Sequence, residues 1–381
     1  MWKLHDSIAQ RFPLVARPRP TCLPLPQRVH ALAELADDAG KQGDPGLAST
    51  VYNQAALVAS DVGVPATARA MCHQHAAAYL HAAPLPSSAA IRALEPLVNL
   101  ARLQLRAGQT DDGRQRLLEL FDAVTTGSAI RVEGITVPAD LVANAADRHD
   151  VRSWLWSVLL ADGTRALTTA GRWGEALAHI ETHRGVGQRM LDGRQVAVLA
   201  ALTSGNTLEA GSLLAHAVPG EAWEEAVTGC LTVLCRRVSG QPWRRSLRDL
   251  VTTYLERPDR DDTAVFDTRL GLAVLDVVGS GKDPVARLVV TELHRRTIKT
   301  TDGYAAREVL SHPLFIALAT DREARDCRAL LHACSLEAGV LPTELGDQLT
   351  AALRTSDRVI RRSVARPEPH PLGVNRVQEV R

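Results

Sequence analysis

Aromatic side chains are scarce in this chain of 381 residues, with Phe, Trp and Tyr together making up 4%. The strands of β-sandwiches and β-barrels rely on aromatic and β-branched residues, so this scarcity disfavours both architectures. Alanine and leucine are abundant instead, and both residues favour helices. The composition therefore predicts an all-α protein.

Cysteine is also scarce, with six residues and no pair in the CxxC spacing. Most of them lie in apolar helical stretches, where a reduced thiol behaves as a small hydrophobic group. We expect neither a disulfide framework nor a structural zinc site. No uncharged apolar run approaches the roughly 20 residues of a membrane span, and the N-terminus lacks the apolar core of a signal peptide. We therefore expect a cytoplasmic location and no membrane partner.

An excess of charge of one sign is missing as well, because 44 Lys and Arg residues face 43 Asp and Glu residues. The formal net charge of +1 argues against binding of nucleic acid through bulk electrostatics. Lysine itself is rare: only 4 of the basic residues are lysines and 40 are arginines. This bias is typical of the codon usage of a GC-rich bacterial genome.

Prolines cluster near both ends of the chain. Five lie between residues 13 and 26, so residues 1–27 are predicted to form an extended leader, because proline cannot occupy a helix interior. Residues 28–364 have apolar residues at helical spacing, separated by short turns, and form the predicted helical domain. Residues 365–381 combine proline with arginine and are predicted to be a disordered tail.

One segment inside the helical domain has a different pattern. Residues 127–138 alternate apolar and polar side chains around Ile130, Val132, Ile135 and Val137, which predicts a small β-hairpin or an extended loop. Such an insertion can act as a lid, contact a partner, or pack over the helices. The sequence leaves these three roles open.

A glycine-marked turn recurs along the chain. The intervals between the glycines are 65, 63, 34, 35 and 41 residues, close to 34 or to its double. Glycine can end a helix because it accepts the left-handed conformation. In five of the six cases, the residue five positions after the glycine is small. In five of the six, the residue nine positions after it is apolar. The six glycines are Gly43, Gly108, Gly171, Gly205, Gly240 and Gly281.

These turns resemble those of the tetratricopeptide repeat family. The run Gln42-Gly43-Asp44 with the small and apolar residues that follow it is similar to the family's turn and second helix, as are residues 170–177. Residues 99–108 look like its first helix and turn. The resemblance covers residues 28–300, although most of the family's first-helix Trp and Tyr are absent. It implies an α-solenoid of stacked antiparallel helix hairpins, a right-handed superhelix, with a concave groove that binds a protein or peptide.

The resemblance also implies which residues line that groove. They stand nine and six residues before a glycine: Asn99 and Arg102 before Gly108, and Asp162 and Arg165. Arginine presents a fork that fits a carboxylate or phosphate, and asparagine can pair with a peptide amide. The alternative is that these four residues are a solvated helix face.

Two further groups of residues could carry chemistry. Asp147, His149, Asp150 and Arg152 combine an acid, a base and a cation, as general acid–base catalysis requires. The same residues also suit a helix start, with Asp147 or Asp150 as the cap. His179 and His183 have a spacing that can chelate a metal, but no third ligand is marked, so we expect a structural role.

The repeat, combined with the lack of a complete catalytic constellation, leads us to expect a non-catalytic cytosolic scaffold or adaptor. It would bind a protein or peptide in its concave groove, need no cofactor or metal, and serve a bacterial biosynthetic or regulatory system. One alternative is a peptide- or ligand-sensing regulatory protein that acts through a separate DNA-binding partner. Another is an enzyme, or an essential accessory of a biosynthetic cluster, with its site near residues 147–152.

Overall fold

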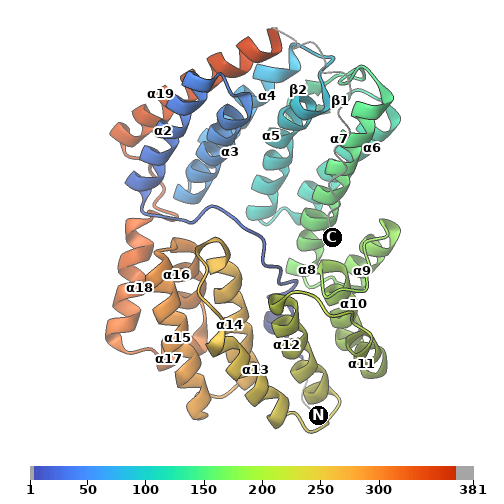
Figure 1. Ribbon diagram of the computed structural model, residues 1–381, viewed down its shortest axis with the longest axis vertical. Coiled ribbons are helices and arrows are strands. Elements are labelled where there is room, and N and C mark those ends of the chain that lie inside the picture. The colour runs from blue at the N-terminus through green and yellow to red at the C-terminus, as the bar shows by residue number, and fades with distance from the viewer. Residues whose placement is uncertain (1–3, 366–381) are drawn as a thin grey trace.

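The computed structural model describes residues 4–365, and these residues are mostly helical, with one two-stranded antiparallel hairpin (Figure 1). The all-α prediction is confirmed. The chain runs across one half of the molecule and returns across the other, and the segment before the first long helix passes between the halves (Figure 1). Two large hydrophobic cores result, one in each half.

The first core contains the long helices of the N-terminal part of the chain together with the last helix. Consecutive helices pack side by side, and the last helix lies against α2 and α3 (Figure 1). The helices are α2 (Leu25–Gln42), α3 (Pro45–Val62), α4 (Pro65–Leu80), α5 (Ser87–Arg106), α6 (Thr110–Thr126), α7 (Ala145–Val158) and α19 (Thr343–Ala365).

The second core contains shorter helices. It also takes in side chains from the first residues of the chain, including the short helix α1 (Asp6–Ala9). The other elements are the π-helix η1 (Leu159–Gly163), α8 (Thr164–Thr169), α9 (Trp173–Thr182), α10 (Asp192–Thr203), α11 (Thr207–Ala215), α12 (Ala222–Val238), α13 (Arg244–Glu256), the 3₁₀ turn η2 (Asp261–Thr263), α14 (Ala264–Val278), α15 (Pro284–Thr300), α16 (Gly303–Leu310), α17 (Pro313–Leu318) and α18 (Asp321–Ala333).

Residues 127–138 form a hairpin of β1 (Ile130–Val132) and β2 (Ile135–Val137), paired in register from Ile130 opposite Val137. Val132 and Val137 are buried in the first core. The hairpin turn is held by Glu133, whose carboxylate accepts hydrogen bonds from Arg69 and Arg116. Of the three roles that the sequence left open, the observed contacts are those of packing over α4 and α6.

The glycine turns mostly behave as the spacing predicts. Five of the six glycines have a positive φ, between 66° and 83°. The sixth prediction is wrong, because α14 ends two residues earlier, at Gly279 with a φ of 70°, and Gly281 lies in the turn that leads to the cap Asp283. Small residues five positions after the glycines lie where the second helix meets the first. A Cβ on Gly113, for example, would stand 2.9 Å from the carbonyl oxygen of Ala101.

The ends of the chain differ from the prediction at two points. The leader is not extended throughout 1–27, because α1 forms within it and α2 begins at Leu25. Pro26 falls in the first turn of α2, where its missing N–H would have no helical partner anyway. The predicted tail lies outside the described residues, except for Ala365, which ends α19. No described helix combines the length and apolar character that crossing a membrane requires.

Candidate functional site

The leader segment, residues 11–24, crosses the interior between the two halves of the molecule (Figure 1). Its apolar side chains Phe12 and Leu14 are buried in the second core. Further along, Cys22 packs in a small cluster with Tyr304 and Cys334. The leader therefore connects the second core, where it begins, to the first core, where α2 begins.

Gln195 of α10 holds the leader by its backbone. Its side-chain oxygen accepts a hydrogen bond from the N–H of Leu14 at 2.7 Å, and its side-chain nitrogen donates to the carbonyl of Leu14, also at 2.7 Å. The same nitrogen donates to the carbonyl of Met190 at 3.0 Å. Gln195 is completely buried, so one amide side chain satisfies both backbone groups of an extended residue.

Ion pairs and a backbone hydrogen bond attach the rest of the leader. Arg11 pairs with Asp276 of α14, and Arg17 pairs with Asp192 at the start of α10. The carbonyl of Cys22 accepts a hydrogen bond at 2.8 Å from the N–H of Gly303. The leader is thus bound as an extended peptide would be, through its backbone, its apolar side chains and its charges.

Two adjoining cavities flank the leader. They enclose about 400 Å³ and about 660 Å³. Four residues line both cavities, namely Pro13 of the leader, Leu105 and Arg106 of α5, and Arg165 of α8. Because they share this wall, we treat them together as the central cavity.

All four residues predicted for the groove line the larger part of the central cavity. Arg102 donates to Asp162 at 2.9 Å and to the side-chain oxygen of Asn99 at 3.1 Å. Asn99 in turn donates to Asn53 at 3.0 Å. Three of the four are therefore joined in one polar network, and Arg165 stands apart from it.

Sequence reasoning missed several lining residues. Glu95 and Arg106 share the cavity face of α5 with Asn99 and Arg102, and the spacing of four, three and four residues is that of one helix face. This signal was present in the sequence. No spacing in the sequence marks Gln195 or the leader as lying near the cavity, because only the tertiary fold brings them there.

A π-helical turn carries Asp162 to the cavity wall. The turn η1 joins α7 to α8, and its wider winding is often found at functional sites. The Nε2 of His179 lies 3.2 Å from the carbonyl of Leu159 and donates to it, since a carbonyl can only accept. His179 therefore has a structural role in supporting the π-turn, and burial lowers its pKa.

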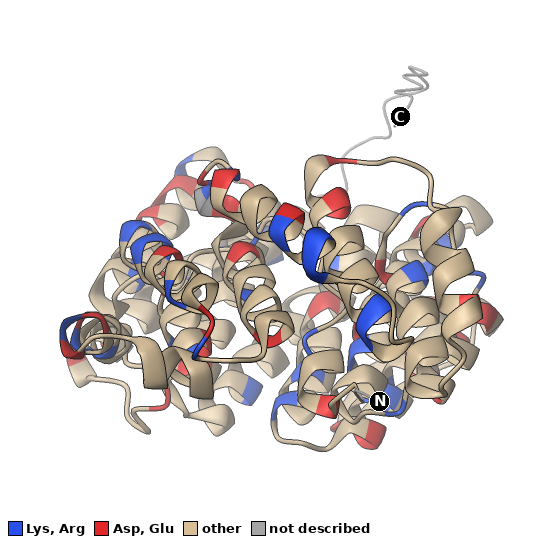
Figure 2. Cartoon of the chain, turned by 90° about the horizontal axis from the view of Figure 1, so that it is seen from below, with Lys and Arg blue, Asp and Glu red and all other residues tan. Residues whose placement is uncertain are grey.

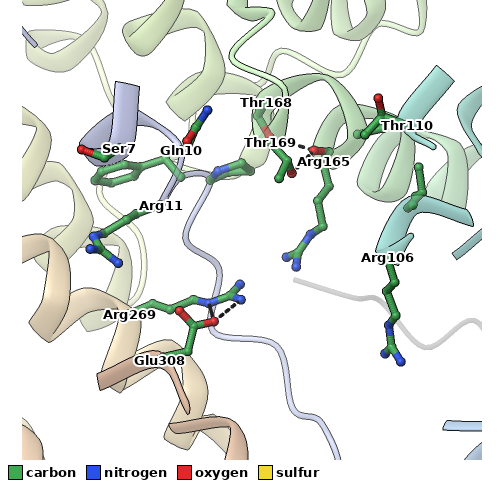
Figure 3. Close-up of a pocket in the computed structure, with 14 residues that line it drawn as sticks. Ser7, Gln10, Arg11, Arg106, Thr110, Arg165, Thr168, Thr169, Arg269 and Glu308 are labelled. Atoms are coloured by element: carbon green, nitrogen blue, oxygen red, sulfur yellow. Dashed lines mark hydrogen bonds and ion pairs between the residues drawn. The ribbon is translucent and has the colours of Figure 1, made fainter. Parts of the chain in front are cut away.

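The arginines of the central cavity differ in their partners. Figure 3 shows Arg165 pointing into the cavity and Arg269 paired with Glu308 across from it. Arg165 has no ion pair with any residue between 4 and 365. Desolvation lowers the pKa of Arg165, the positive charges of Arg269 and Arg19 lower it further, and the carboxylates of Asp162 and Asp192 partly oppose this shift. Arg19 also has a lowered pKa, mainly because of burial, and stacks 4.3 Å from the ring centre of Tyr304.

The positive charge gathers at the central cavity, although several of its arginines remain accessible to solvent. In the view of Figure 2, basic and acidic segments are mixed along the helices, without one basic and one acidic region. In the central cavity, by contrast, seven arginines meet four carboxylates. Burial raises the pKa of one of these acids, Glu95, which disfavours its charged form.

The second predicted group, Asp147, His149, Asp150 and Arg152, lies in the first half of α7. Asn144, rather than Asp147 or Asp150, caps α7 by accepting from the N–H of Asp147 at 2.9 Å. Asp147 instead accepts at 3.0 Å from the N–H of Ser87, the first residue of α5. Its carboxylate thus serves the start of a neighbouring helix. His149, Asp150 and Arg152 are exposed, and none of them lines a pocket among those described.

Within residues 4–365, no group of three or more His, Cys, Asp or Glu side chains could hold a metal ion. The chain matches no protein-family model, no curated protein and no solved structure. The contacts of the leader and the charges of the central cavity are therefore the observations from which a function can be inferred.

Proposed function

We propose that this protein is a non-catalytic scaffold or adaptor that binds an extended segment of a protein or peptide in a concave groove of stacked helix hairpins. The repeated glycine turns and the small residues behind them support a solenoid of the tetratricopeptide type. The observation that carries the proposal is the pair of hydrogen bonds between Gln195 and the backbone of Leu14. Such bonds recognise an extended backbone whatever its side chains.

In this proposal the leader occupies the peptide site of its own chain. A partner segment would replace it, and would need an apolar residue in the place of Leu14 and a basic residue in the place of Arg17. Asp192, which pairs with Arg17, would select that basic residue. We place the protein in the cytoplasm of a bacterium, consistent with six free and buried cysteines.

The test uses the full-length chain and a labelled peptide of residues 10–21. In the variant Leu14→Asp, a charge in the apolar pocket should release the leader, and the peptide should then bind, as measured by fluorescence anisotropy. Adding Gln195→Ala to this variant should weaken the binding about tenfold or more, because two buried hydrogen bonds are lost. Circular dichroism checks that each variant is folded.

A peptide that itself carries Leu14→Asp is the matched control and should not bind. Equal binding of the native peptide to both proteins, with and without Gln195, would contradict the proposal. If Leu14→Asp does not fold, the double variant Phe12→Ala and Leu14→Ala serves the same purpose. No binding to either folded variant would refute it.

A second candidate function is a ligand-sensing regulatory protein that acts through a separate DNA-binding partner. The observation that favours it is the central cavity, which lies against the leader and contains two arginines, Arg19 and Arg165, that make no ion pair within the described residues. A ligand there would touch Pro13 and so affect how firmly the leader is held. No observation favours an enzyme with a site near residues 147–152.

A further inference from the structure

The central cavity has more positive than negative groups on its walls. Seven arginines and four carboxylates line its two parts. The arginines are Arg11, Arg17, Arg19, Arg102, Arg106, Arg165 and Arg269, and the carboxylates are Glu95, Asp162, Asp192 and Glu308. An open cleft with this balance attracts anions, because its protein walls focus the field of the charges that line it.

Most of these arginines are already paired. Arg11 pairs with Asp276, and Arg17, Arg102 and Arg269 each contact one of the lining carboxylates. Arg106 is 3.5 Å from Asp61, which also pairs with Arg28. One carboxylate is therefore shared between two guanidinium groups, and Arg106 is only partly compensated.

Arg165 and Arg19 have no carboxylate within 4.0 Å among residues 4–365, although Asp162 and Asp302 respectively act on them from farther away. Arg19 is stacked on Tyr304, but Arg165 extends freely into the space between Arg106 and Arg269 (Figure 3). Three guanidinium groups from three different helices thus line the same space, and the one in the middle makes no ion pair within 4.0 Å among the described residues.

Neutral donors and apolar walls complete the cavity. Thr110, Ser7 and Gln10 present polar side chains at its edge (Figure 3). Phe12, Pro13, Leu105 and Ala166 form apolar wall beside them. A ligand with one strongly anionic end and a small organic body would satisfy both kinds of wall.

We propose that the central cavity binds a small organic phosphate, with its phosphoryl group held by Arg165 and flanked by Arg106 and Arg269. A phosphoryl group carries close to two negative charges near neutral pH and accepts paired hydrogen bonds from guanidinium forks. The volumes of about 400 and 660 Å³ lie within the usual range for small-molecule sites. A folded partner domain would not fit this space.

The site goes beyond peptide binding: the leader in its own place forms part of the cavity wall, and the residues that would hold the phosphoryl group differ from those that hold the leader. The peptide contacts are made by Gln195 and Asp192 of α10, whereas the phosphoryl contacts come from α5, α8 and α14. Failure of the peptide test would leave this site in place, and failure of the phosphate test would leave the peptide contacts in place.

The experiment compares ribose 5-phosphate, inorganic phosphate, ribose and sodium chloride of matched ionic strength, using the native full-length protein. Calorimetry and thermal melting should detect binding of ribose 5-phosphate, weaker binding of inorganic phosphate, and none of ribose. The variant Arg165→Gln should bind ribose 5-phosphate about tenfold or more weakly. Arg165→Lys should be intermediate, because it keeps the charge but loses the fork.

The matched control is Arg322→Gln on α18, since the Arg322 side chain is 85% exposed, lies near Asp326 on the same helix, and lines neither part of the cavity. It should bind like the native protein. Equal effects of sodium chloride and the phosphates, or unchanged binding by Arg165→Gln, would overturn the proposal. The proposal would also be overturned if a peptide of glutamate residues binds in a way that depends on Arg165 while ribose 5-phosphate does not bind.

Discussion

The two hydrophobic cores of this protein are completed from opposite ends of the chain. The first core is built from α2–α7 and is covered by the last helix, α19. The second core is built from α8–α18 and takes in residues 8–14 from the start of the chain. Each end of the chain therefore packs in the half of the molecule that is remote from it in sequence.

This exchange solves a problem that every stack of helices has. A terminal helix pair exposes an apolar face unless something covers it. Here α19 covers α2 and α3, and the leader fills the interior beside α10. The segments that cover the two cores differ in how much of them is helical. The first core is covered by α19, a helix of 23 residues, whereas the only helix in the leader is α1, with 4 residues.

The cores also differ in the helices that compose them. Helices α2 to α6 have 16 to 20 residues, whereas α9, α11 and α16 have 10, 9 and 8. Short helices are marginal by themselves and depend on tertiary contacts. We therefore expect the second core to rely more heavily on the leader than the first core relies on any one segment.

The largest effect is expected at the junction between the two halves. Asp61 of α3 is buried, pairs with Arg28 at 2.7 Å and accepts a hydrogen bond from the hydroxyl of Tyr304 in α16. Asp61→Ala leaves a buried guanidinium and a hydroxyl without their acceptor. It should lower the free energy of unfolding by about 3–5 kcal/mol, measured by urea denaturation.

The control for this junction is Asp37→Ala on the exposed side of α2, which should change the free energy of unfolding by less than about 0.5 kcal/mol. A similarly small change for Asp61→Ala would show that the halves are held together by packing alone. If the Asp61→Ala variant unfolds in two separate transitions, one for each core, Asp61 couples the unfolding of the two cores in the native protein.

The next largest effect tests the exchange of chain ends itself. Ile360 of α19 and Phe12 of the leader are both buried, in the first and second core respectively. Ile360→Ala and Phe12→Ala should each cost about 3 kcal/mol, because each leaves a cavity. Hydrogen exchange should accelerate in α2 and α3 for Ile360→Ala, and in the helices of the second core for Phe12→Ala.

Leu208→Ala is the control for both, because Leu208 is 87% exposed on α11. It should leave stability and hydrogen exchange unchanged. Faster exchange that follows sequence neighbourhood instead, in α18 for Ile360→Ala and α2 for Phe12→Ala, would contradict the assignment of the two covers.

The smallest effect is a pH dependence that belongs to the first core. His75 of α4 is buried and stacks on Tyr52 at 4.9 Å, and burial lowers its pKa to about 3. The unfolded chain, with a histidine pKa of about 6.5, binds the proton more readily. The stability contributed by neutral His75 is therefore fully present above about pH 6.5, and it is lost as the pH falls from about 6.5 towards the pKa of the folded protein.

The measurement compares native protein with His75→Phe, which cannot titrate. Between about pH 7.5 and about pH 5.5, the native protein should lose about 1.4 kcal/mol more of its free energy of unfolding than the variant. His30→Gln, at an exposed position on α2, should behave like the native protein. An identical pH dependence for native protein and His75→Phe would show that His75 does not titrate in this range.

Local patterns in the sequence predicted a large part of this architecture. Ala48, Ala176, Ala210 and Ala286 are all completely buried, as expected for residues five positions after a glycine turn. These expectations succeed because a turn and the close helix contact behind it depend on neighbouring residues only. The error at Gly281 is also local, since Gly279 two residues earlier accepts the same left-handed conformation.

The positions of four lining residues also follow from local register. The resemblance implied Asn99, Arg102, Asp162 and Arg165 from their places before a glycine turn, and all four line the central cavity. The register could not show that Arg102 pairs with Asp162 while Arg165 stays unpaired. The distribution of partners depends on where α5 and η1 lie relative to each other, which no local pattern contains.

The sequence by itself determined the helices, their glycine turns, the small residues at their contacts and the polar faces of α5 and α8. The tertiary structure alone decided that the leader lies against Gln195 and that α19 covers α2 and α3. Residues 14 and 195, or the helices α2 and α19, are too distant in the chain for any periodicity to link them. Long-range contacts of this kind depend on how all the helices between them pack, and it is these contacts that make an arginine-lined cavity out of separate helix faces.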